Sequence, residues 1–152
     1  MLKDIYVRLQ KVHRLPLLDV LDREFQLSAV EEEDFPLRRI LARMGETLQD
    51  ASDVLHVILQ PDTGSLMELC ECRCFSETDK NEAFELFRRL MRLVRAITES
   101  NFLLTDENDA STVRLVAKDW PELRKAMFPL VAKMKECWHR PVSSRAVLEY
   151  MG

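Results

Sequence analysis

The stretch Phe84-Glu-Leu-Phe-Arg-Arg-Leu-Met-Arg-Leu-Val-Arg-Ala-Ile97 is the most apolar long helical pattern in the chain. At about 100° per residue, its apolar side chains spread over roughly half of the helix circumference, which is wider than a surface helix needs. We therefore expect a central helix from Asp79 to about Ser100, capped by Ser76 or Thr78. The residues expected in its core-facing arc include Phe84, Phe87, Leu90, Met91 and Val94.

Two further long helices are predicted on either side of this one. Residues 35 to about 60 have the most regular apolar period in the chain, with Asp34 as the expected N-cap. Downstream, Asp119-Trp-Pro-Glu122 matches a capping box with proline in the first turn, and the helix that it starts should kink at Pro129 and end at Pro141.

Shorter helices are expected between and outside the long ones. They are predicted for residues 2–13, with Leu2, Ile5, Leu9 and Val12 on one face, for residues 17–26, for residues 66–74, and for a last segment containing Val147, Leu148 and Tyr150. Ser65-Leu-Met-Glu68 forms a capping-box pattern that supports the third of these.

Two segments are ambiguous between helix and strand. Residues 66–75 contain the alternating run Cys70-Glu-Cys72-Arg-Cys74, which would also suit a strand. Residues 101–117 would fit a hairpin, or a loop followed by a helix. We favour the second arrangement because a lone hairpin is marginally stable.

Composition points to one globular helical domain. The chain has 152 residues, of which 47% are apolar and 32% charged, and only three are glycine. This length suits a single domain, and the shortage of glycine favours helices with short connections. We expect residues 1–152 to form one all-α domain, an irregular antiparallel bundle of three long and several short helices.

Charge and hydropathy bear on location and partners. The net charge is −4, with an acidic first half and a mildly basic second half. No apolar run reaches the roughly 20 residues of a membrane span, and the first residues lack the order of a signal peptide. We therefore expect a soluble cytoplasmic protein with no membrane partner. A reducing compartment disfavours disulfides, so the four cysteines are expected to be thiols or metal ligands.

A cysteine cluster is the first candidate site. Cys70, Cys72, Cys74 and the distant Cys137 supply the ligand type that zinc prefers. On a helix, however, Cys72 would point away from the face shared by Cys70 and Cys74. The alternative is that these are small buried side chains, because free cysteine is among the most buried residue types. We favour burial and expect no cofactor, with zinc as the alternative.

An acidic stripe is the second candidate. Glu46, Asp50 and Asp53 recur at helical spacing on the helix predicted for residues 35–60. The stripe resembles the acidic helix motif of the all-α MazG-type nucleotide pyrophosphohydrolases, which implies magnesium held against a triphosphate. That family takes carboxylates from two helices, and a helical Glu-Glu-x-x-Glu partner is missing here. We favour a solvated charged face.

An arginine face is the third candidate. Arg88, Arg92 and Arg95 lie within about 60° of one another on the central helix, where guanidinium groups would suit a polyanion such as nucleic acid. The alternative is that they pair with nearby glutamates.

No pattern of nucleophilic catalysis is present: the three histidines are isolated and there is no glycine-rich phosphate loop. The sequence therefore favours a non-enzymatic interaction protein, an adaptor or small subunit that binds a protein partner or itself. The alternatives are a polyanion-binding subunit and a metal-dependent pyrophosphohydrolase-like enzyme.

Overall fold

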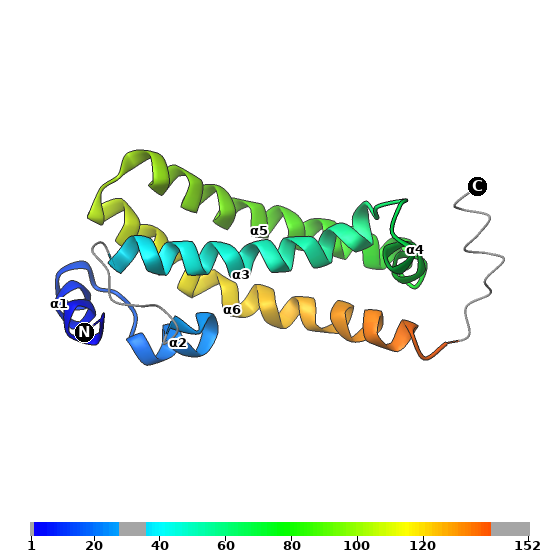
Figure 1. The fold of residues 1–152 in the computed structure, drawn as a ribbon, viewed down its shortest axis with the longest axis horizontal. Coiled ribbons are helices and arrows are strands. Elements are labelled where there is room, and N and C mark those ends of the chain that lie inside the picture. The colour runs from blue at the N-terminus through cyan, green and yellow to red at the C-terminus, as the bar shows by residue number, and fades with distance from the viewer. Residues whose placement is uncertain (1, 28–35, 141–152) are drawn as a thin grey trace. The chain divides into compact units, whose positions relative to one another are not determined.

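A computed structural model describes residues 2–27 and 36–140, and this part of the chain contains six helices and no strand (Figure 1). The helices are α1 (Leu2–His13), α2 (Leu18–Phe25), α3 (Pro36–Leu59), α4 (Leu66–Cys72), α5 (Glu77–Leu103) and α6 (Asp106–Cys137). The predicted all-α helical bundle is confirmed. The expected N-cap Asp34 and the expected last short helix lie outside the described residues.

The described residues divide into two compact units. The first holds the chain up to Gln49 and the segment Leu90–Glu122, and the second holds Asp50–Arg89 and the chain from Leu123 on. The long helices α3, α5 and α6 each contribute a segment to both units. The single domain expected from chain length stays a prediction. None of the described helices combines the length and the hydrophobicity needed to cross a membrane.

Each long helix buries a stripe whose members are four and three residues apart in alternation, and Ile40, Ser52, Ala110 and Thr112 are buried beside it. In α3 the stripe is Leu37, Leu41, Met44, Leu48, Ala51, Leu55 and Ile58; in α5 it is Ala83, Leu86, Leu90, Leu93, Ile97 and Ser100; in α6 it is Asp109, Val113, Val116, Trp120, Leu123, Met127, Leu130, Met134 and Cys137. A period of 3.5 residues is the spacing by which coiled-coil helices pack against one another. The long helices therefore pack through coiled-coil-like seams.

The buried residues of α5 differ from those expected from the sequence. Phe84 is 54% exposed, whereas its small neighbour Ala83 is fully buried. Phe87, Met91 and Val94 are half-buried, and Leu90 alone among the five expected residues is fully buried. The apolar arc of this helix is wider than the face that its neighbours cover, so the seam on Leu86 and Leu90 leaves Phe84 in solvent.

Helix α6 corrects the expected boundaries in the second half of the chain. It begins at Asp106, where Thr105 Oγ1 accepts a hydrogen bond from the Asn108 backbone N–H at 3.3 Å. The hairpin for residues 101–117 is wrong, and Pro121 lies inside the helix rather than near its start. Pro121 and Pro129 each remove one backbone hydrogen-bond donor from α6. The buried seam continues before and after both prolines and stabilises the longer helix.

Helix α4 confirms the predicted helix with Ser65 as its N-cap. The Ser65 hydroxyl accepts a hydrogen bond from the Glu68 backbone N–H at 3.3 Å, and the strand alternative for residues 66–75 is wrong. In α1, by contrast, Ile5 and Val12 of the expected apolar face are 42% and 74% exposed, and Tyr6 is buried instead. The Tyr6 hydroxyl donates to the Pro16 carbonyl at 2.7 Å, and burial raises the pKa of Tyr6 to about 12.

Candidate functional site

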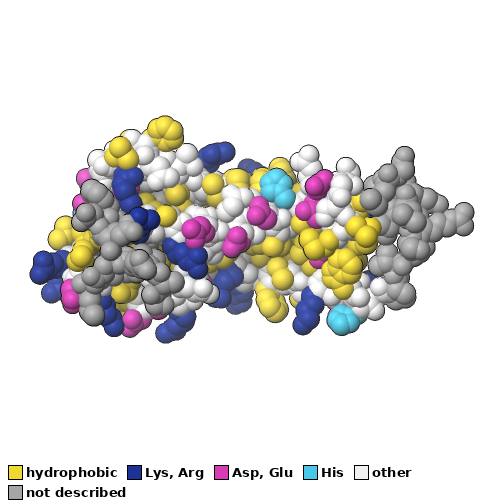
Figure 2. Space-filling model, in the orientation of Figure 1, with side chains coloured by type: hydrophobic (Ala, Val, Ile, Leu, Met, Phe, Trp, Pro, Cys, Tyr) yellow, Lys and Arg dark blue, Asp and Glu magenta, His cyan; other side chains and the backbone are white. Residues whose placement is uncertain are grey.

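Three consecutive apolar residues, Phe102, Leu103 and Leu104, are exposed at the last turn of α5, where the chain leaves that helix for α6. Their exposed fractions are 83%, 48% and 65%. Helix α5 ends at Leu103 and α6 begins at Asp106, so the turn is short. Figure 2 shows hydrophobic side chains projecting from the surface where α5 ends. We call Phe102, Leu103 and Leu104 the apolar turn.

The backbone of the apolar turn is held in an uncommon conformation. Leu104 has a φ of 58°, in the left-handed region, and its N–H donates to the Ser100 carbonyl at 3.1 Å. This bond closes the C-terminal end of α5, a position where glycine or asparagine is usual. A residue with a Cβ in this region costs about 1–2 kcal/mol.

Buried polar side chains connect the residues next to the apolar turn. The Ser100 and Thr112 hydroxyls, both buried, lie 2.5 Å apart in a hydrogen bond that either can donate. The Ser100 hydroxyl is also 3.4 Å from the Asn108 carbonyl, and when it donates its one proton there, Thr112 is the donor of the bond between the two hydroxyls. These bonds join the last turn of α5 to the first turns of α6. The exposed side chains therefore stand on an ordered base.

An ion pair between a half-buried arginine and a buried carboxylate lies in the first unit. Asp109 is 1% exposed, and its Oδ2 lies 3.5 Å from the Nε of Arg38 on α3. Burial raises the pKa of Asp109, while the positive charge of Arg38 opposes this rise. Within the described residues, Asp109 Oδ1 and Arg38 Nη2 have no hydrogen-bond partner. The charged form of Asp109 is therefore only partly compensated.

Asp109 should make stability depend on pH. Because its pKa is raised in the folded state, its contribution to the free energy of unfolding is largest below its ordinary pKa and is lost as pH rises through the raised value. We expect Asp109→Asn to gain stability relative to the wild type as pH rises from about 4, measured by urea unfolding at several pH values. Glu107→Gln, at an exposed position, is the control. A difference between Asp109→Asn and the wild type that stays constant with pH contradicts the expectation.

The surroundings of the apolar turn are acidic. Glu99, Asp106 and Glu107 are exposed, and no Lys or Arg occurs from residue 96 to residue 113. The nearest basic residue along α5 is Arg95, seven residues before Phe102 and so about 10 Å along the helix axis, which is about one Debye length at moderate salt. The turn is therefore better suited to a partner protein than to a polyanion.

The predicted arginine face lies on α5 and is exposed. Arg88 Nη1 lies 3.2 Å from Glu85 Oε2, a surface ion pair of the kind expected as the alternative. Arg92 and Arg95 are exposed further along the same helix. Polyanion binding by these residues stays a prediction.

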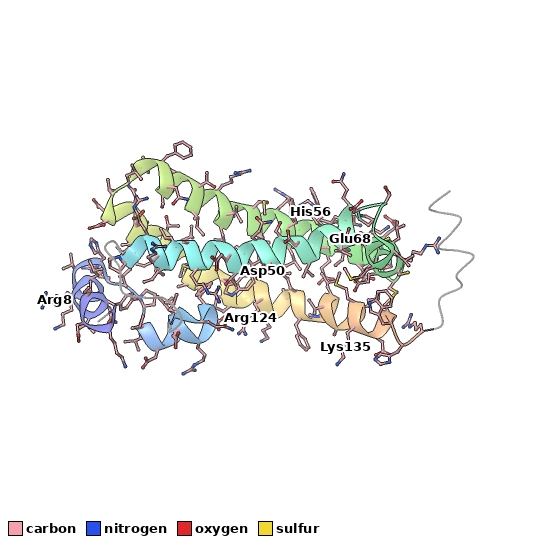
Figure 3. All side chains as sticks on the ribbon, in the orientation of Figure 1. Arg8, Asp50, His56, Glu68, Arg124 and Lys135 are labelled. Atoms are coloured by element: carbon pink, nitrogen blue, oxygen red, sulfur yellow. A yellow bond between two sulfur atoms is a disulfide. The ribbon has the colours of Figure 1, made fainter. Side chains whose placement is uncertain are left out.

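The acidic stripe projects from α3 into solvent. Figure 3 shows Asp50 on this helix, and Glu46 and Asp53 are exposed as well. Glu46 Oε2 pairs with Arg43 Nη1 at 2.6 Å, an ion pair that suits the solvated charged face favoured from the sequence. In residues 2–27 and 36–140, no three His, Cys, Asp or Glu side chains are arranged to hold a metal ion.

The cysteine cluster contains a disulfide, which corrects the expectation of four thiols. Cys74, just after α4, is bonded to Cys137 at the end of α6, with their Cα atoms 6.0 Å apart. Cys70 is a buried thiol and Cys72 a half-buried one, and burial raises the pKa of Cys72. Sulfur atoms in a disulfide offer no thiolate to a metal. A zinc site at all four cysteines would therefore require the reduced form.

Reasoning from the sequence missed the apolar turn. Its signal was present as Phe102-Leu-Leu104 between polar runs, but the segment was assigned to a loop whose exposure the sequence does not reveal. Comparison of the chain with protein-family models, with curated proteins and with solved structures found no match.

Proposed function

We propose that this chain is a non-enzymatic interaction protein, an adaptor or a small subunit of a larger assembly, that docks through its apolar turn. The observation that carries the proposal is the exposure of three consecutive apolar side chains on an ordered base. Runs of exposed apolar residues lower solubility and do not contribute to a core, so they are typical of binding sites. The strained position of Leu104 also supports a role outside folding, because a polar residue would suit this backbone better.

The proposal predicts a partner that depends on the apolar turn. Phe102→Ser combined with Leu104→Ser should abolish co-purification of a stoichiometric partner, or self-association measured by sedimentation velocity. The matched control is Phe84→Ser combined with Leu17→Ser, which also replaces an exposed phenylalanine and an exposed leucine. A monomer that retains no partner, or equal binding by both double variants, contradicts the proposal. Reproducible hydrolysis of nucleoside triphosphates with magnesium would replace it by the enzymatic alternative.

Leu104→Asn provides a test of the strain. Asparagine tolerates the left-handed region, so we expect the free energy of unfolding to rise by about 0.5–1 kcal/mol, measured by urea unfolding. Leu103→Asn, within α5, is the control and should not stabilise the protein. If Leu104→Asn destabilises the fold, the side chain of Leu104 has a packing role, which contradicts its assignment to a binding site.

The second candidate function is binding of a polyanion by Arg88, Arg92 and Arg95. The observation that favours it is their exposure on one helix. A fluorescein-labelled single-stranded oligonucleotide should then bind at low salt, with affinity falling steeply as salt rises. Arg88→Glu with Arg92→Glu should abolish that binding, whereas Arg8→Glu with Lys11→Glu should not.

A cytoplasmic location is likewise a proposal from the sequence. The Cys74–Cys137 disulfide weighs against it, because cytosolic thiols are kept reduced.

A further inference from the structure

A second exposed stripe runs along the C-terminal part of α6, in the second unit. Its members are Arg124, Phe128, Val131 and Lys135 on the helix and Trp138 in the turn directly after it. They are separated by four and three residues in alternation, and each directly follows a member of the buried seam. The stripe is therefore rotated by about 100° from the seam. Figure 3 shows Arg124 and Lys135 on the same side of α6. We call these five residues the α6 stripe.

The apolar members of the α6 stripe are large and accessible. Phe128 is 71% exposed, Val131 41% and Trp138 52%. The Trp138 Nε1 donates to Glu71 Oε2 on α4 at 3.2 Å, and Met67 lies one helical turn before Glu71 and is 55% exposed. Figure 2 shows hydrophobic side chains gathered over α4 and the end of α6. Aromatic residues, methionine and arginine are the types enriched in protein interfaces.

The surface around this stripe is basic. Residues 123–140 contain five Lys and Arg and one Glu, a net charge of +4. The charge of Lys133 is paired with Asp79, to which it donates a hydrogen bond, and this bond lowers the pKa of the Asp79 carboxyl to about 2. Exposed basic residues beside the stripe and within it include Lys125, Lys135 and Arg140. An acidic partner surface would complement them.

We infer that the α6 stripe, with Met67 beside it, is a docking surface for an amphipathic helix of a partner protein, with acidic residues flanking the apolar face of that helix. The alternating spacing of four and three residues is the spacing that a second helix matches when it packs alongside. From Arg124 to Trp138 the stripe spans 14 steps, or about 21 Å, so a partner helix of about four turns covers it. This surface shares no residue with the apolar turn, and the inference does not depend on the function proposed for that turn.

The geometry disfavours a single-stranded nucleic acid on the same surface. Phe128 and Trp138 are ten residues apart, or about 15 Å along the axis, which is too far for stacking of successive bases. The indole of Trp138 is also bonded to the Glu71 carboxylate, whose charge repels phosphate. The aromatic side chains therefore suit a helix better than a strand of bases.

The test uses the full chain and a synthetic probe. The probe is a labelled 18-residue helical peptide with leucine at heptad positions a and d and glutamate at e and g, and binding is followed by fluorescence anisotropy at low salt. Phe128→Ala, and separately Lys125→Glu with Lys135→Glu, should each weaken binding about tenfold or more. Lys118→Glu, exposed on the same helix outside the stripe, and Phe84→Ala, exposed on α5, should change it less than twofold. A scrambled peptide of the same composition should not bind.

Several outcomes overturn the inference. These are no binding of the peptide to the wild type, equal loss with Lys118→Glu, or a preference for a lysine-flanked version of the peptide. A dT20 oligonucleotide or phosphatidylserine vesicles may replace the peptide as probe; if either binds through Phe128 and Lys135 while the peptide does not, the surface is for nucleic acid or membrane instead. The apolar-turn variant Phe102→Ser with Leu104→Ser should leave peptide binding unchanged. The peptide test and the test of the apolar turn can therefore fail separately. Circular dichroism and thermal unfolding of each variant confirm that the helices are intact.

Discussion

Cys74→Ser is expected to lower the free energy of unfolding by about 4 kcal/mol under non-reducing conditions, because the bond to Cys137 closes a long loop in the unfolded chain. The two cysteines are 63 residues apart in the sequence, and an unfolded chain tied at these points has far fewer conformations. Urea unfolding with and without reductant measures the effect. Reductant should destabilise the wild type by a similar amount and leave Cys74→Ser almost unchanged.

Cys72→Ser is the matched control, because Cys72 is also half-buried, lies two residues away and takes no part in the bridge. It should remain sensitive to reductant. Titration of the unfolded chain should find two thiols before reduction and four after it. Four thiols before reduction, or equal stability of the two serine variants, would show that the bridge is absent from the protein in solution.

Leu90→Ala is expected to lower the free energy of unfolding by about 2–5 kcal/mol, because Leu90 is fully buried in the α5 seam and alanine leaves a cavity. Phe84→Ala, on the same helix, should cost less than about 1 kcal/mol, since more than half of the Phe84 side chain is already in solvent. Urea unfolding of the two variants beside the wild type gives both values.

Comparing Leu90→Ala with Phe84→Ala shows whether α5 buries only the residues of the seam or the wider apolar arc expected from the sequence. Similar losses at both positions would place Phe84 in the core, as expected from the sequence alone. A large loss at Phe84 with a small one at Leu90 would reverse the orientation of α5.

Local signals in the sequence were sufficient for most of the helices. The regular period of α3 and the capping box at Ser65 each depend on residues close together in the chain, and both were predicted correctly. The start of α6 was missed because Asp119-Trp-Pro-Glu122 looks like a helix start when read locally. Whether a proline ends a helix or lies within it depends on the seam before it, and that seam is stabilised by other helices.

The candidate sites were harder to predict for the same reason. Exposure decides whether Phe102 or Phe128 is a core residue or a binding residue, and exposure depends on which neighbours cover a helix face. The bond between Cys74 and Cys137 joins segments 63 residues apart, a pairing that sequence alone does not define. The residue types were visible in the sequence, but their grouping required the structure.

The seam and the stripe of α6 share one period, and this limits how the length of the helix can change. Adding a single residue before Arg124 would rotate everything downstream by about 100°, carrying Phe128 and Lys135 away from the surface where they now lie together. An insertion or deletion of seven residues turns the helix by nearly two whole revolutions, within about 20°. It would preserve both the buried and the exposed face. Changes in the length of this helix over evolutionary time should therefore occur in multiples of seven, matched by equal changes in the helices that pack against it.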